Sequence, residues 1–432
     1  MQSGLTLKNR AIKSARGSVD VKRPVFFFHL LLLIVCVFGQ MANFGSTWLS
    51  VANITSVVIG PFLAARLLRS KIDAETKFII TAFAIIFGLS AISVLNDKLE
   101  NSVYYLRDIY VSIYWIILAL YWIKYFPEKI NISLKIVTSI LFTVAVLQFS
   151  YEYYGYGLNP DLSDDFYIHA NSAFDLGYPS VMGNPNNYAA FLLPIIFIFT
   201  TESKNKIDKF IITVCVLSLI IAGSRLAIFG AIIAFLMIKN LKIKIMLIVF
   251  MILTYFLMSR SGESFDIYSI DKMMQFFTLS YSDYTSENSI GSRILTHELF
   301  FRNFDEFFVG SYSPSLMCPQ FKNIYEIDDL MQFSPHSMLI ELQCMFGLFG
   351  LISYVFLIIG ILIFCYRYNV SKIRIFIIIL ICIMATTIPS NIFRSSQQFF
   401  SLTIFVVWMA RGWDQLDLND ARGILKPARV SR

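Results

Sequence analysis

The sequence predicts an all-α, polytopic membrane protein of about twelve transmembrane helices with one large, partly helical outer loop. Three observations predict this fold class. Hydrophobic residues make up 56% of the 432 residues and the mean hydropathy is +0.65, which exceeds what a soluble fold can bury. Apolar stretches of roughly 17–22 residues recur along the chain, and at ~1.5 Å per residue they match the roughly 30 Å hydrocarbon core of a bilayer. Lysines and arginines gather in alternate connections, as in multi-pass proteins.

The apolar spans lie between two basic tails, residues 1–24 and residues 412–432. We expect both tails in the cytoplasm, because short basic segments stay on that side. No cleavable signal peptide is expected, so the first span is itself the insertion signal. The spans are predicted at residues 25–43, 47–65, 78–95, 109–126, 136–152, 186–201, 207–223, 226–241, 244–258, 337–365, 373–389 and 398–411.

Two outer connections are longer than a simple turn needs. Residues 153–187 form an outer loop within residues 25–258, which hold the first nine spans. Residues 259–335 form the large outer loop, and residues 336–411 hold the last three spans. The large loop contains "SRILTHELFFRNFDEFFVG", whose apolar residues recur at helical spacing and predict a partly helical cap. Long surface loops often carry function, so we expect active-site residues here.

Arg225 is the only charged residue between Phe210 and Ile238. An arginine in the middle of a span would be costly. Two short helices with "GSR" at an outer turn avoid that cost and keep the lysines on both sides of the pair in the cytoplasm. Gly223 and Ser224 suit such a turn. We therefore predict Arg225 at the outer membrane–water boundary, facing protein or water.

The six cysteines predict no disulfide framework on the outer face. Only Cys318 lies clear of an apolar stretch, so the others cannot pair in a periplasmic loop. We interpret the remaining five as small apolar packing residues.

Charged residues in the large outer loop point to local interactions. The loop holds eleven acidic residues against five basic ones, so it is a poor general phosphate-binding surface. Arg302 lies close to Asp305 and Glu306, which favours an ion pair. Arg293 has no acid four residues away and precedes a helical stretch whose N-terminal amides also favour anions. For Arg293, an ion pair and an anionic ligand both remain open.

His336 lies where the chain re-enters the membrane, directly after Pro335, a residue suited to a helix start. A lone histidine is usually structural, but its ordinary pKa near neutrality also suits a proton acceptor. Glu341 follows within an apolar stretch and needs a partner or a function there. His29 is expected to be a core or interfacial residue.

No metal or cofactor is expected. The pairs Asp164–Asp165 and Asp328–Asp329 offer oxygen ligands, but adjacent acids in polar loops are usually just solvated. No His/Cys cluster has zinc spacing and no phosphate-binding glycine loop occurs. Nucleotide-driven chemistry is therefore unsupported, and no nucleic-acid partner is expected.

Four motifs in order resemble the bacterial O-antigen polymerase and O-antigen ligase superfamily of integral membrane glycosyltransferases. They are "GNPNNYAAFLLP" (183–194), "AGSRLAIFGA" (222–231), "GSRILTHELFF" (291–301) and "SPHSMLIELQCMFGLFGLISY" (334–354). The resemblance implies an inverting, metal-independent enzyme of the inner (cytoplasmic) membrane whose active site faces the periplasm. Its donor would be an undecaprenyl-diphosphate-linked oligosaccharide.

The resemblance also implies a set of site residues. Arg225 and Arg293 match the arginines expected to bind the donor diphosphate, and His336 matches the histidine expected to act as base. Ser337 departs from the more common His-Asn pairing, which puts a supporting role of that neighbour in doubt. Residues expected to support the site are Asn184, Asn187, Glu341 and Arg394.

We interpret the protein as a polymerase that joins undecaprenyl-diphosphate-linked repeat units of O-antigen or exopolysaccharide, within lipopolysaccharide or polysaccharide biosynthesis. The alternative is a ligase that transfers the glycan to lipid A–core. The outer loop 153–187 contains no Lys or Arg, and this surface would repel a phosphorylated core. A second alternative is a transporter of lipid-linked oligosaccharide, although its charges would lie nearer mid-membrane. Expected partners are the lipid bilayer, a flippase and a chain-length regulator.

Overall fold

The computed structural model describes residues 22–38, 51–69, 99–153, 185–202, 206–222, 225–237, 244–245, 248–249, 297, 300–301, 337–389 and 396–411. Within these residues every regular element is a helix, and none is a strand. The all-α class predicted from the sequence is confirmed for this part of the chain.

The helices follow the predicted apolar spans closely. The predicted span 78–95 lies outside the described residues, as does 244–258 apart from two dipeptides. Each of the other predicted spans overlaps one α-helix, and the largest difference is at α5, which begins at Leu99 rather than at residue 109. The α-helices are α2 (Lys22–Phe38), α3 (Val51–Arg69), α5 (Leu99–Tyr125), α6 (Ile130–Tyr153), α7 (Pro185–Glu202), α8 (Lys206–Ala222), α9 (Arg225–Met237), α15 (Met338–Arg367), α16 (Lys372–Ala385) and α17 (Gln398–Arg411), and the 3-10 helix η2 (Pro127–Lys129) precedes α6.

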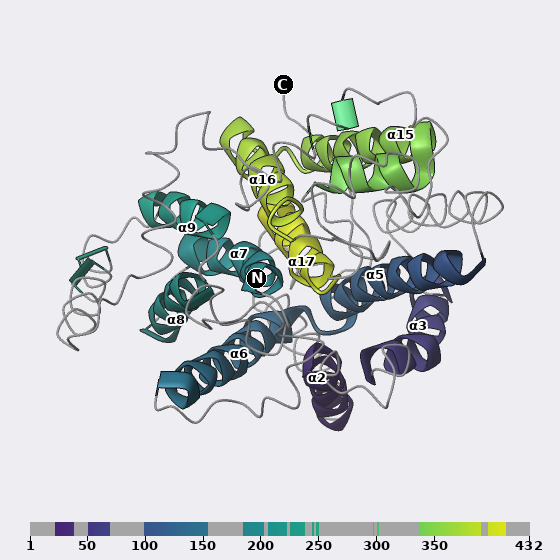
Figure 1. The fold of residues 1–432 in the computed structure, drawn as a ribbon. Coiled ribbons are helices and arrows are strands. Elements are labelled where there is room, and N and C mark those ends of the chain that lie inside the picture. The colour runs from purple at the N-terminus through teal and green to yellow at the C-terminus, as the bar shows by residue number, and fades with distance from the viewer. Residues whose placement is uncertain are drawn as a thin grey trace, which may run out of the picture.

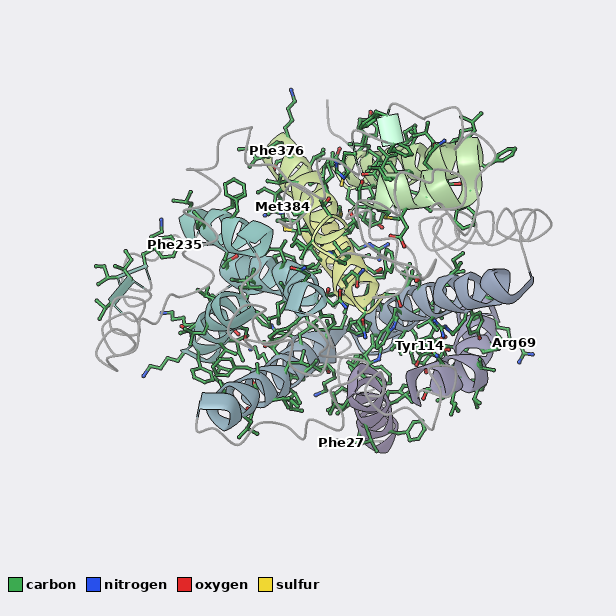
Figure 2. All side chains as sticks on the ribbon, in the orientation of Figure 1. Phe27, Arg69, Tyr114, Phe235, Phe376 and Met384 are labelled. Carbon is green, nitrogen blue, oxygen red and sulfur yellow. The ribbon has the colours of Figure 1, made fainter. Side chains whose placement is uncertain are left out.

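Two of the described helices are long and apolar enough to cross a membrane: Ile130–Leu147 in α6 and Phe346–Arg367 in α15. Only 39% and 28% of these windows are buried within the protein, whereas the core helix of a soluble protein is mostly buried. Large apolar side chains also point away from the bundle: Phe27 and Phe376 are 64% and 65% exposed at its margin (Figure 2). These features indicate association with a membrane.

Helix α7 is the central helix of the bundle. Its side chains from Tyr188 to Phe199 are buried on all sides, as expected for a helix enclosed by others. It packs against α8, α9, α16 and α17, and α17 in turn packs against α5, which contacts α3. Figure 1 shows α7, α8 and α9 as one group beside α16 and α17.

Contacts at the helix ends define the directions of α15, α16 and α17. The guanidinium of Arg411, which ends α17, lies over the rings of Tyr368 and Phe364 near the end of α15, 4.9 and 5.8 Å from their centroids. The backbone N–H of Met338, which begins α15, donates to the carbonyl of Thr386, just beyond α16, at 3.3 Å. Helix α16 therefore runs opposite to α17, and α15 begins beside the end of α16 and ends beside the end of α17.

Helices α7 and α9 run in the same direction as α17. Near the end of α7, the ammonium of Lys135 on α6 lies 5.7 Å from the ring centroid of Phe199. Earlier in α7, Leu193 lies beside Gly230 of α9, where a side chain would collide with it and would approach Met384 of α16 to 3.0 Å. Met384 lies near the end of α16, so the starts of α7 and α9 lie at the same end of the bundle as the end of α16. Because α16 runs opposite to α17, α7 and α9 run in the same direction as α17.

The bundle therefore has two ends, named here after one residue of each. The Asn187 end holds the starts of α7, α9, α15 and α17 and the end of α16. The Lys135 end holds the starts of α6, α8 and α16 and the ends of α5, α7, α15 and α17.

Gly347 divides α15 into two helical segments. Its φ of 60° and ψ of −144° lie in a region that essentially only glycine adopts. Gly350 lies against the backbone carbonyl of Leu342, so a side chain at Gly350 would collide with it. The candidate span starts at this kink, with Phe346. The predicted span 337–365 therefore contains two helical segments, and the candidate membrane span is the second, from Phe346.

Candidate functional site

Arg225 is the first residue of α9, and Asn187 lies in the first turn of α7. Helix α8 ends at Ala222 and α9 begins at Arg225, as two separate helices, and the turn predicted at residues 223–224 lies outside the described residues. Both α8 and α9 pack against α7, which brings the backbone of Arg225 to the Asn187 end. The side chain of Arg225 lies outside the described residues, whereas that of Asn187 is 9% exposed.

The Asn187 end gathers the N-termini of four helices, α7, α9, α15 and α17. The first amide groups of a helix have no partner within the helix and carry a partial positive charge. Several N-termini at one end of a bundle therefore favour an anionic group there, even without counting arginine side chains.

The start of α15 is attached to the end of α16. Ser337, the N-cap of α15, has extended backbone angles and makes no side-chain capping bond. Met338 donates its N–H to Thr386, which fixes the backbone directly after His336 beside α16. His336 itself lies outside the described residues.

The short segment before Gly347 carries two polar side chains in a buried setting. Glu341 is 2% exposed and Gln343 is fully buried, and each interacts with other groups of the protein. The sequence placed Glu341 within a long membrane span. It lies before the kink at Gly347 and outside the candidate span Phe346–Arg367.

The start of α17 adds polar residues that the sequence analysis did not identify. Ser396, Gln397 and Gln398 are each at most 1% exposed. The sequence contains a signal for it, because "SSQQ" directly precedes an apolar stretch. Trp115 of α5 lies beside this segment, with its ring centroid 6.2 Å from that of Phe400. No sequence signal connected Trp115 to it.

Asn184, Arg293 and Arg394 lie outside the described residues, as do both aspartate pairs. Among the residues that the structure describes, no group of three or more His, Cys, Asp or Glu side chains is arranged to hold a metal ion.

No protein-family model, curated protein or solved structure matches this chain. The functional interpretation therefore depends on the residues and on their arrangement at the Asn187 end.

Proposed function

We propose that the protein is an inverting, metal-independent glycosyltransferase of the inner membrane. In this proposal it has about twelve spans, and the Asn187 end faces the periplasm together with the loop of residues 259–335. It polymerises glycan repeat units that are linked to undecaprenyl diphosphate.

The gathering of helix N-termini at one end of an apolar bundle is the observation that carries this proposal. A diphosphate headgroup needs positive potential, while its polyprenyl tail needs an apolar surface that runs down the bundle. The helix N-termini provide the first, with Arg225 at the start of α9. The exposed apolar side chains along the helices, such as Phe349 and Phe356, provide the second.

The reaction breaks one bond and forms one. The bond between C1 of the donor sugar and the diphosphate oxygen breaks, and undecaprenyl diphosphate leaves with the electron pair. An acceptor hydroxyl oxygen attacks C1 from the opposite face, so the anomeric configuration inverts. His336 accepts the hydroxyl proton, and Arg225 and Arg293 hold the leaving diphosphate. Guanidinium groups suit this task because they stay charged and bind phosphate oxygens bidentately.

The glycan profile of a deletion strain tests the proposal. Loss of a polymerase leaves the core with a single repeat unit, which runs as one short band on a gel. The full chain expressed from a plasmid should restore the ladder, and a variant carrying both Arg225→Lys and Arg293→Lys should not.

Two other profiles would contradict the proposal. A bare core, with long chains accumulating on undecaprenyl diphosphate, would identify a ligase. Repeat units retained on the cytoplasmic face would identify a transporter. The matched variant Arg69→Lys changes an exposed arginine at the end of α3 (Figure 2) and should restore the full ladder.

A further inference from the structure

The start of α17 contains a run of buried polar groups whose hydrogen-bonding capacity is not used. Ser396 and Gln397 are each 1% exposed. The hydroxyl of Ser396 and both amide atoms of Gln397 have no hydrogen-bond partner among the described residues. Each buried polar group left without a partner costs about 1–3 kcal/mol, so such a run is unfavourable unless something else binds it.

Two groups from other helices reach the same level of the bundle. The ring of Phe197 on α7 lies 6.2 Å from that of Phe405 on α17. Asn187 precedes Phe197 by ten residues, which is ~15 Å of helix, and Gln397 precedes Phe405 by eight residues, which is ~12 Å. Because α7 and α17 run in the same direction, Asn187 and Gln397 lie at a similar height along the bundle.

Trp115 completes this set from α5. Its ring lies 6.2 Å from that of Phe400, which follows Gln397 by three residues. The side-chain oxygen of Asn187 and the indole N–H of Trp115 are also buried without a partner among the described residues. Helices α5, α7 and α17 therefore bring polar groups without a partner among the described residues to a similar height along the bundle.

These groups are all neutral, and they include both donors and acceptors. An amide and a hydroxyl can each donate and accept, the Asn187 oxygen accepts, and the indole N–H donates. A phosphate or carboxylate offers only acceptor oxygens, so it would leave the side-chain oxygens of Gln397 and Asn187 without donors. Sugar hydroxyls also donate and accept, so a neutral sugar matches the set in both charge and hydrogen bonding.

We propose that Ser396, Gln397, Asn187 and Trp115 form a binding site for a neutral sugar of the lipid-linked glycan. This inference rests on the proposed function, because it identifies the sugar next to the diphosphate as the ligand. The site lies at the end of the bundle where Arg225 begins α9, so diphosphate and sugar bind side by side. Its role is to select the sugar and hold its ring in place.

Binding measurements on the full chain in nanodiscs test the inference. The probes are undecaprenyl diphosphate alone and the same lipid carrying N-acetylglucosamine, galactose or glucose. The wild-type protein should bind at least one sugar-bearing lipid about tenfold more tightly than the bare lipid. Gln397→Leu should abolish that preference and leave the Kd of the bare lipid unchanged.

The stability of the same variant separates a ligand site from a structural contact. Leucine removes two unpaired polar atoms at similar volume, so the ligand-free Gln397→Leu protein should unfold at a higher temperature than wild type. A structural glutamine would give a lower midpoint, and that result would overturn the inference. Thr138→Val is the matched control: it removes another buried, unpartnered hydroxyl, on α6, and should change no lipid affinity.

The remaining outcomes separate this inference from the proposed function. If wild type binds none of these lipids, both are wrong. If it binds the bare lipid and all three sugar-bearing lipids equally, the sugar site is wrong and the proposed function stands. The sugar site is also wrong if the Gln397→Leu variant still binds a sugar-bearing lipid more tightly than the bare lipid, because Ser396 and Gln397 then bind only water.

Discussion

The two ends of the bundle use their polar residues differently. At the Lys135 end, charged side chains are satisfied within the protein. Lys135 forms an ion pair with Asp208, and their side chains are 16% and 5% exposed. Arg66 lies over the ring of Tyr125, 4.9 Å from its centroid, and the Tyr125 hydroxyl donates to the Arg66 carbonyl at 3.3 Å.

At the Asn187 end, the buried polar groups are mostly neutral and several lack partners within the described residues. Single unpartnered atoms also occur elsewhere, such as the hydroxyl of Thr138. The run at Ser396 and Gln397 differs because adjacent residues are unpartnered together. This comparison suggests that one end holds the helices together and the other binds a ligand.

His336→Ala should produce the largest effect on turnover. Removal of a general base lowers the rate by about 10²–10⁴. In wild type the rate should fall below about pH 6, because a protonated imidazole cannot accept a proton. Transfer from purified lipid-linked donor, measured against pH, checks both points. Ser337→Ala is the control and should keep near-normal rates, since Ser337 makes no capping bond. A flat pH profile would leave the histidine with a positional role only.

Arg225→Lys should lower turnover by about 10²–10³. The compact ammonium of lysine replaces a planar guanidinium, which can bind two oxygens of the leaving diphosphate at once. The variant should still insert and keep the wild-type melting temperature. Initial rates and thermal unfolding of the same preparation measure the two effects. Near-normal rates would remove Arg225 from the site and weaken the distinction between the two ends.

Asp208→Asn should change stability rather than turnover. It leaves the half-buried Lys135 without its partner, and we expect a loss of about 2–3 kcal/mol, between the values for buried and exposed pairs. Thermal unfolding in detergent measures the loss. Lys206→Gln, an exposed lysine on the same turn, is the control. The double variant Lys135→Met with Asp208→Leu should recover part of the stability. A normal melting temperature with lost activity would contradict the structural role of this end.

The smallest effect is expected from a labelling variant that tests which end faces outward. Cys365 is fully buried and cannot report on topology. Its neighbour Tyr366 is 82% exposed, so Tyr366→Cys in a cysteine-free background is a better reporter. An impermeant thiol reagent should label Cys318 in intact spheroplasts and Tyr366→Cys only after the membrane is opened, with little change in activity. The reverse pattern would invert the proposed orientation.

Much of the fold was predictable because apolar length and helix breaks are local properties. One charge and a Gly-Ser pair predict two short helices on either side of residues 223–224, and the structure has α8 and α9 as separate helices. His29 was expected in the core or at an interface; it is 7% exposed and hydrogen-bonded to the Tyr121 hydroxyl at 3.0 Å. Cys215 and Cys365 are buried free thiols, as predicted for packing residues.

The candidate site was less predictable because it depends on contacts between distant segments. Gly347 reads as one more small residue in an apolar helix, and only its backbone angles reveal the kink. Lys135 and its partner Asp208 lie 73 residues apart in the sequence, so no local pattern connects them. The roles predicted for Arg293, Asn184 and Arg394 stay predictions.

The sequence by itself determined the helical class, most helix boundaries and the positions of unusual charges, because each depends on neighbouring residues and on the length of an apolar segment. The tertiary structure decided which helix starts meet at one end and which polar groups are left unpaired there. Asn187, Trp115 and Gln397 are far apart in sequence, and their shared level follows only from the packing of α5, α7 and α17. Hydrogen-bond partners are a property of that packing, so no local pattern could reveal their absence.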